Sequence, residues 1–522
     1  MATDGPSAAQ RDARAAPYGP RAEQNDRLAE QYDLLVVGGG INGIGIARDA
    51  AGRGLSVLLV EKDDLASHTS SWSSKMIHGG LRYLEQYEFR LVSESLQERE
   101  VLLKVAAHLV FPMRFVMPHV AELRPRWMIR LGLFLYDHLS RRTTLPGSHA
   151  VSLAVPPYNA GLKAALRNGF IYSDCRVDDA RLVIANALDA RQHGAKILTR
   201  TACVSAERKH GVWQVQLRSD SGETRAVAAR AIVNAAGPWV KAVLNGQLQQ
   251  PSRDNVRLIK GSHIVVPRQY EGEHAFILQN DDKRVVFMIP YEGSYTLIGT
   301  TDVSVEGDPA SPRASEAEVD YLCRAVNRYL EKPVGPQDVV WSYAGVRPLY
   351  DDGSSDPSDV TRDYTLRVDD MDGGAAVLSV FGGKITTYRR LAEHALEKLT
   401  PYFPGLKPAW TADAPLPGSD FSAGSAAAYA ELCSRHAQIP EQALRGIFRR
   451  HGALAQTVLG DARAEADLGE HFGAGLYARE LRYLIDAEWA RSAEDVLWRR
   501  SKTGLHLTPA QRDRVADWLA GA

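Results

Sequence analysis

Residues 32–61 read YDLLVVGGGINGIGIARDAAGRGLSVLLVE, and this stretch decides the fold of the chain. An apolar run at residues 34–37 leads into a glycine-rich turn, and a second apolar run at residues 57–60 follows a segment typical of a helix. Short apolar runs placed on either side of a helix are typical of buried parallel strands. The stretch therefore predicts a strand–helix–strand unit and an α/β fold.

The turn in this unit carries the pattern of a dinucleotide site. Gly38, Gly40 and Gly43 are spaced as GxGxxG, for a tight turn, a close backbone approach to a pyrophosphate and a close helix–strand contact. A helix that begins near Asn42 would direct free amides and its positive dipole end at phosphates. Glu61 ends the second strand, where a carboxylate accepts hydrogen bonds from ribose hydroxyls and repels a 2′-phosphate. The unit predicts a Rossmann-like site for an ADP-containing dinucleotide other than NADP.

Composition limits the classes of protein. A chain of 522 residues is long enough for two or three domains. The 62 Lys and Arg residues balance the 63 Asp and Glu residues, so no overall field favours nucleic acid. The four cysteines are far apart and form no metal-ligand pattern with histidine, so no metal site is expected and each is interpreted as a buried apolar side chain.

The chain contains no apolar run long enough to cross a bilayer. Residues 1–30 lack the apolar core of a secretory signal and are interpreted as a disordered extension. Residues 88–107 predict an amphipathic helix whose charges are solvated. Antiparallel strands are expected at residues 257–302, including a hairpin around residues 292–294.

Residues 124–142 place a run of apolar and aromatic side chains between two clusters of arginine. Such a segment can lie in a membrane interface, with the arginines at anionic headgroups and the apolar face inserted. It can equally be a core helix with charged ends, and the sequence leaves both interpretations open.

The later motifs resemble one family, that of FAD-dependent glycerol-3-phosphate dehydrogenases of the aerobic, quinone-linked type. Besides the glycine turn, the resemblance rests on SSKMIHGGLRYLE (73–85), YSDCRVDDARL (172–182), VNAAGPW (233–239), RLIKGSHIVVP (257–267), IGTTD (298–302), YAGVRPL (343–349), TRDYTL (361–366), FGGKITTYR (381–389) and DVLWRR (495–500). It runs from about residue 32 to the end of the chain, and small departures such as Ala344 do not affect a charged site residue.

The resemblance implies a mixed α/β and α+β architecture around non-covalent FAD. A Rossmann-like FAD-binding domain interleaved with an antiparallel-sheet substrate domain is expected at residues 31–400. A linker rich in Pro, Gly, Ala and Ser is expected at residues 401–425, and a helical domain at residues 426–522.

The implied reaction oxidises sn-glycerol 3-phosphate to dihydroxyacetone phosphate by hydride transfer to N5 of FAD. Arginine suits the phosphate because its fork binds bidentately and stays charged, and histidine suits proton removal when it is held neutral by nearby cations. The expected catalytic residues are His78, His263 and Arg347, with the choice of base left open between the histidines. The expected substrate-binding residues are Arg82, Tyr83, Arg362 and Lys384.

The expected FAD-binding residues lie in the turns and in segments rich in serine, threonine and glycine. They are Gly38, Gly40, Asn42, Gly43, Glu61, Ser73, Ser74, Gly80, Gly237, Gly383 and Thr386. In this family the reduced flavin passes its electrons to a membrane quinone. The resemblance thus implies a protein on the cytoplasmic face of the membrane, and a homodimer is left open.

Two rival functions share these motifs. One is an oxidase of glycerol 3-phosphate that passes electrons to O2, and the other is a catalytically inactive flavin-binding protein at the membrane. The full set of arginines and histidines argues against the inactive protein. A third rival, the oxidation of an amine or amino acid on a related fold, would require a carboxylate clamp and no grip on phosphate.

Overall fold

The computed structural model describes residues 29–120, 123–140, 144–251, 254–282, 284–305, 307–351, 363–371 and 373–521. Within them the chain forms two compact units, Ala29–Ser419 and the segment that begins at Asp420. The predicted N-terminal extension up to residue 28 and the candidate residue Arg362 lie outside the described residues.

The glycine-rich stretch builds the centre of the first sheet. β1 (Gln31–Val37) pairs in parallel with β2 (Val57–Val60) and with β10 (Thr224–Asn234), and α2 (Ile41–Gly52) connects β1 to β2. The strand order is β17-β18-β10-β1-β2-β7, in which β17 is Tyr364–Asp369, β18 is Ala376–Gly382 and β7 is Lys196–Leu198. The predicted strand–helix–strand unit is confirmed.

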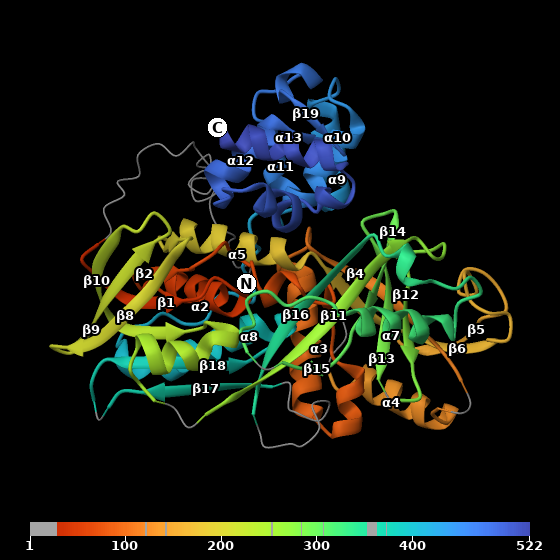
Figure 1. The fold of residues 1–522 in the computed structure, drawn as a ribbon, viewed down its shortest axis with the longest axis horizontal. Coiled ribbons are helices and arrows are strands. Elements are labelled where there is room, and N and C mark those ends of the chain that lie inside the picture. The colour runs from red at the N-terminus through yellow and green to blue at the C-terminus, as the bar shows by residue number, and fades with distance from the viewer. Residues whose placement is uncertain are drawn as a thin grey trace, which may run out of the picture. The chain divides into compact units, whose positions relative to one another are not determined.

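Helices and a small antiparallel layer extend this sheet (Figure 1). α2 packs against α5 (Asp179–Gln192) and α8 (Tyr388–Leu399). β8 (Thr201–Lys209), β9 (Val212–Ser219) and the first half of β10 form an antiparallel meander. β10 then continues into the parallel sheet beside β1, so that its carboxyl end lies next to the glycine turn.

The second sheet is the predicted antiparallel layer. Its order is β15-β11-β14-β13-β12-β4-β6-β3, with β16 paired to β11 and β5 paired to β6. The bounds are β3 (Met76–Ile77), β4 (Val110–Pro118), β5 (His149–Ser152), β6 (Asn168–Val177), β11 (Val256–Pro267), β12 (Ala275–Gln279), β13 (Val285–Tyr291), β14 (Tyr295–Gly299), β15 (Val303–Ser304) and β16 (Trp341–Tyr350). The hairpin expected around residues 292–294 joins β13 to β14.

The larger unit also contains α3 (Phe89–Val105), α4 (Arg126–His138), α6 (Val240–Ala242) and α7 (Glu316–Asn327). The amphipathic helix predicted at residues 88–107 is confirmed as α3, but the prediction that its charges are solvated is wrong in part. Glu98 and Arg99 are buried. Arg99 donates to Asp174 on β6, and Glu98 accepts from Arg389 on α8, because paired charges are stable where solvent is excluded.

The smaller unit is helical, as predicted. It contains α9 (Ser425–Arg435), α10 (Glu441–His451), α11 (Ala455–Leu459), α12 (Ala478–Glu488) and α13 (Pro509–Ala520), with a short hairpin of β19 (His471–Gly473) and β20 (Leu476–Tyr477). Its own apolar core includes Leu444, Phe472, Leu481, Leu484 and Val515. Residues 401–419 belong to the larger unit, where Trp410 lies under Arg48 of α2.

Candidate active site

The glycine turn has the geometry that a nucleotide phosphate needs. Gly38 has a φ of +114°, and a Cβ atom on it would lie 2.5 Å from the carbonyl oxygen of Ala235. A Cβ atom on Gly43 would lie 2.0 Å from the carbonyl oxygen of Gly38, so only glycine lets α2 approach β1 this closely. Gly237, at the end of β10, has a φ of +55°. These positions leave a backbone cradle between β1, α2 and β10.

Polar groups at the cradle fit a dinucleotide. α2 begins at Gly40 without a side-chain cap, so amides of its first turn face outward with the positive end of the helix dipole. The Ile41 amide donates to Ser70 Oγ at 2.9 Å. Asn42 Nδ2 donates to the carbonyl of Gly382 at 3.3 Å, while its buried Oδ1 has no partner among the described residues. Gly383 lies beside Asn42. The set fits the phosphates of FAD.

Glu61 follows β2 directly, at the expected place, and its carboxylate is bound to backbone. Oε2 accepts from the Gly39 amide at 2.6 Å, and Oε1 accepts from the Asp63 amide at 2.8 Å. Burial raises the pKa of this carboxyl group above its usual value, against the effect of these two hydrogen bonds. Glu61 therefore shapes the glycine turn itself, and its contact with a ribose stays a prediction.

His263 lies on β11 in a buried, polar setting. Its Nε2 is 2.9 Å from Ser74 Oγ, and its ring stacks on Tyr343 of β16 at 4.8 Å between centroids. Its Nδ1 has no hydrogen-bond partner in the described part of the chain. Burial, then the charges of Lys75 and Arg347, lower the pKa of His263 to about 3. The imidazole is therefore neutral near pH 7.

His78 directly follows β3, and it is held differently. Its amide donates to Thr386 Oγ1 at 3.3 Å, which joins this segment to the start of α8. Burial, then the charges of Lys384 and Arg99, lower the pKa of His78 to about 3. Both candidate bases are therefore neutral at working pH, and burial contributes more to this than the surrounding cations do.

Two of the cationic candidates, Arg82 and Arg347, lie near one carboxylate. Arg347 on β16 pairs with Asp302 at 2.9 Å and donates to the Thr301 carbonyl at 2.9 Å. Arg82 Nη1 lies 4.0 Å from the other oxygen of Asp302. Residues 82 and 347 are far apart in sequence, but both guanidinium groups lie within 4.0 Å of Asp302. Asp302 belongs to the motif IGTTD, but no signal in the sequence distinguished it from a structural acid.

Two further candidate residues, Lys384 and Tyr83, contact each other. Lys384 Nζ lies 4.2 Å from the centre of the Tyr83 ring, a cation–π arrangement. Gly80 adopts a φ of +80°, and the chain turns there into the short helical segment Leu81–Gln86 that carries Arg82 and Tyr83. Residues 73–86 therefore contact two parts of the candidate site. Ser74 contacts His263 on β11, and His78 contacts Thr386 before α8.

Two buried groups escaped the sequence analysis. Asp179, the first residue of α5, accepts from Ser73 Oγ at 2.7 Å and pairs with Lys75 at 2.7 Å. Ser73 thus contacts protein here, and its predicted contact with FAD stays a prediction. Tyr343 donates from its hydroxyl to the Ser73 carbonyl at 2.8 Å.

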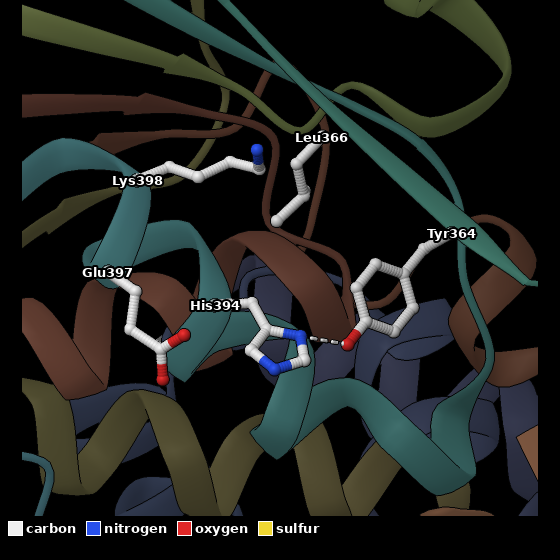
Figure 2. A pocket seen from close by; sticks show the side chains of 5 residues that line it. All are labelled: Tyr364, Leu366, His394, Glu397 and Lys398. Atoms are coloured by element: carbon white, nitrogen blue, oxygen red, sulfur yellow. Dashed lines mark hydrogen bonds between the residues drawn. The ribbon is translucent and has the colours of Figure 1, made fainter. Parts of the chain in front are cut away.

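A separate pocket of about 400 Å³ opens between β17 and α8 (Figure 2). Tyr364, Leu366, His394, Glu397 and Lys398 line it, and the Tyr364 hydroxyl is hydrogen-bonded to His394 Nδ1. None of the predicted site residues lines this pocket. It is therefore not part of the candidate active site.

A sheet built on a glycine cradle, with an antiparallel layer that carries neutral histidines and arginines, defines an FAD-dependent oxidoreductase. The family model described as FAD dependent oxidoreductase matches residues 33–389, and the C-terminal domain of alpha-glycerophosphate oxidase matches residues 409–520. The chain belongs to the family of FAD-dependent glycerol-3-phosphate dehydrogenases.

Two relatives and one solved structure show the extent of the similarity. A glycerol-3-phosphate dehydrogenase of Pseudomonas aeruginosa is 56% identical over 94% of this chain and 96% of its own length. A D-erythritol 1-phosphate dehydrogenase of Brucella abortus is 52% identical over 94% and 98%. The structure of glycerol-3-phosphate dehydrogenase from Bacillus halodurans complexed with FAD has a TM-score of 0.73 at 26% identity, covering 96% of this chain and 97% of that one.

Proposed function

We propose that the protein oxidises sn-glycerol 3-phosphate to dihydroxyacetone phosphate. The observation that carries this proposal is that Arg82 and Arg347 both lie near Asp302, and that Arg347 is on β16, the strand paired with β11, which carries the neutral imidazole of His263. Two guanidinium groups can bind a phosphate dianion bidentately. A neutral imidazole can accept the proton of a secondary alcohol.

The residues divide the work between grip and proton removal. Arg82, Arg347 and Lys384 supply positive charge for the phosphate, and Tyr83 can donate to a substrate oxygen. His78 and His263 are both neutral, so either can take the proton from the C2 hydroxyl group. The glycine cradle, Asn42 and the first turn of α2 would hold FAD, which supplies the hydride acceptor when bound. Ser74, Gly80, Gly383 and Thr386 remain candidates for its flavin end.

D-Erythritol 1-phosphate is the second candidate substrate. The Brucella abortus relative is only four percentage points less identical than the Pseudomonas aeruginosa one, 52% against 56%. Both substrates are phosphorylated polyols that need the same grip on phosphate. The two substrates therefore differ in the space that the site must provide for the carbon chain.

Anaerobic titration decides between these substrates. The purified, FAD-loaded protein is mixed with either compound while the flavin absorbance near 450 nm is followed, and steady-state kcat/KM is measured with a soluble dye. Glycerol 3-phosphate should bleach the flavin and give the higher kcat/KM. A higher kcat/KM for D-erythritol 1-phosphate would overturn the substrate assignment, and bleaching by neither would overturn the proposed function.

We propose that the electrons leave to a quinone at the cytoplasmic face of a membrane, on which α4 lies. No helix among the described residues is long and apolar enough to cross a bilayer. α4 packs Ile129, Leu133 and Tyr136 inward, yet Trp127, Leu131 and Phe134 are 67%, 52% and 53% exposed. An exposed apolar face of this size favours a lipid surface over water. Arg126 and Arg130 are exposed on the same helix, while Arg141 and Arg142 lie outside the described residues.

The acceptor is tested by comparing a quinone with oxygen. Turnover with glycerol 3-phosphate in air should yield little hydrogen peroxide and should rise when a soluble ubiquinone analogue is added. Stoichiometric peroxide that the quinone does not suppress would instead identify an oxidase. Light scattering of the purified protein would test the homodimer.

A further inference from the structure

Lys75 and Asp179 form a buried ion pair next to the candidate active site. Both side chains are buried, and Lys75 Nζ lies 2.7 Å from Asp179 Oδ2 and also donates to the carbonyl of Ser71. Lys75 is held in the left-handed region, with a φ of +58°. A buried pair with strained backbone persists only where its surroundings impose it.

The pair fixes the position of the serine that contacts His263. Asp179 Oδ2 accepts from Ser73 Oγ at 2.7 Å and from the Ser73 amide at 3.3 Å. The Ser73 carbonyl accepts from the Tyr343 hydroxyl at 2.8 Å. Ser73 is thus bound at its side chain, amide and carbonyl. The next residue, Ser74, places its Oγ 2.9 Å from His263 Nε2.

The pair also brings charge to the imidazole. Lys75 Nζ lies 5.0 Å from the centre of the Tyr343 ring, and that ring stacks on His263 with an interplanar angle of 15°. The charged and titratable groups that face His263 are Lys75 from the loop before β3, Arg347 and Tyr343 from β16, and Asp179 from α5. After burial, Lys75 is the strongest influence that lowers the pKa of His263, ahead of Arg347, and Asp179 opposes it.

We propose that Lys75 and Asp179 are a positioning pair, which holds Ser74 against His263 and sets a cation beside the ring so that the imidazole stays neutral. The proposal rests on the proposed function, because it assigns the pair to the oxidation of a polyol phosphate. Neither residue needs to touch the substrate.

The test is the pH profile of kcat/KM between pH 4 and pH 9 for the FAD-loaded protein, corrected for the titration of the substrate phosphate near pH 6. In the unaltered protein the corrected profile should be flat down to pH 5, because the pKa of His263 is about 3. Lys75→Met removes the cation and keeps Asp179, so the acid limb should move upward by about one pH unit or more, into the measured range. Lys75→Arg keeps the charge and should restore the flat profile.

Breaking the pair on one side leaves a buried charge, so a second variant guards against failure to fold. Lys75→Met/Asp179→Asn removes both charges and keeps an acceptor for Ser73. Its acid limb should move upward by less than that of Lys75→Met, because the opposing effect of Asp179 is lost as well. An unchanged profile in whichever of the two variants folds would overturn the proposal.

Arg48→Met is the matched control, because it breaks another buried ion pair of α5. In that pair Asp189 of α5 lies 2.6 Å from Arg48 of α2. The partners of Arg48 are Asp189, Ala414 and Trp410. It should lower stability without moving the acid limb, and a limb that moves as far as in Lys75→Met would contradict the specific role of Lys75. The proposed function is tested separately, by the activity of the unaltered protein with either polyol phosphate. If the unaltered protein oxidises neither compound, the proposed function is wrong, whatever the role of Lys75 and Asp179.

Discussion

At the scale of single residues, the candidate site depends on keeping two histidines uncharged. His263 is buried on β11, and His78 follows β3 and binds Thr386 through its amide. The pKa of each is lowered to about 3. Burial acts first, because an imidazolium ion loses hydration there, and the nearby cations Lys75, Arg347 and Lys384 add to it. The cations that suit a phosphate therefore also help to keep the imidazole neutral, so that it can accept a proton.

The lowered pKa values predict that the free energy of unfolding decreases as the pH falls. The folded-state pKa of each histidine lies below the unfolded value of about 6.5, so the unfolded state binds more protons below that pH. The contribution of the two neutral histidines to the free energy of unfolding is complete above about pH 6.5 and is lost as the pH falls towards 3. Between pH 7 and pH 5, the free energy of unfolding should fall by roughly 2 kcal/mol per histidine.

Urea titrations at pH 7 and pH 5 measure this difference. His263→Gln should reduce it by one histidine's share. His149→Gln is the control, because His149 is exposed on β5. A pH difference that stays the same in His263→Gln would show that His263 does not titrate as described.

At the scale of elements, α4 has two apolar faces with separate roles. The inner face carries Tyr136, whose hydroxyl lies 2.8 Å from both oxygens of Asp174 and accepts from the Gly79 amide at 2.8 Å. The outer face carries the exposed Trp127, Leu131 and Phe134. The core-helix interpretation that the sequence left open holds for the inner face, and the membrane interpretation stays a proposal for the outer face.

The outer face predicts membrane binding. Trp127→Ser/Leu131→Ser/Phe134→Ser should reduce sedimentation with vesicles that contain anionic lipid at least tenfold, because about 1.5 kcal/mol or more of transfer free energy is lost for each side chain. Activity with a soluble dye should stay the same. Val340→Ser/Met371→Ser removes exposed apolar side chains elsewhere and serves as the control. Unchanged sedimentation of the triple variant would remove α4 from the membrane proposal.

The inner face predicts a link between α4 and the candidate site. Tyr136→Phe removes the acceptor of the Gly79 amide and a donor to Asp174, beside His78. Stability should fall by about 1–3 kcal/mol, as for a buried polar group left unpaired, and kcat/KM should fall with it. Tyr402→Phe is the control, since its hydroxyl donates to Asp370 in a half-buried setting away from the candidate site. Equal effects of the two variants in thermal melts would show that the contact with Gly79 contributes nothing.

At the scale of the whole molecule, the chain has two units with separate cores. The smaller unit also buries a cluster of charges, in which Glu480 binds Arg450 at 2.6 Å and His451 at 2.9 Å. Burial opposes ionisation of Glu480, but Arg450 and His451 lower its pKa to about 2. Arg450 and His451 both bind this carboxylate, and His451 Nδ1 also lies 3.4 Å from Glu488.

Glu480→Ala should therefore destabilise the smaller unit. Removing one partner of a buried pair costs about 3–5 kcal/mol, so amide hydrogen exchange should accelerate roughly 100-fold or more in peptides from residues 441–500. The temperature of flavin release should change less, because the glycine cradle lies in the other unit. Glu441→Ala breaks the exposed Glu441–Arg445 pair and should have little effect. Unaltered exchange in Glu480→Ala would contradict the role of the cluster.

The sequence by itself determined the elements whose signal is local. The GxGxxG turn, the apolar runs around it, the β13–β14 hairpin and the amphipathic pattern of α3 follow from short-range backbone and solvation preferences.

Only the tertiary structure decided which distant residues meet. The gathering of Arg82 and Arg347 at Asp302, the burial of Glu98 and Arg99 on a helix expected to carry solvated charges, and the Lys75–Asp179 pair all join segments far apart in the chain. A charged residue has the same letter whether it is solvated or paired, and its partner is set by strand order and helix packing. Those long-range contacts form only when the whole core is assembled.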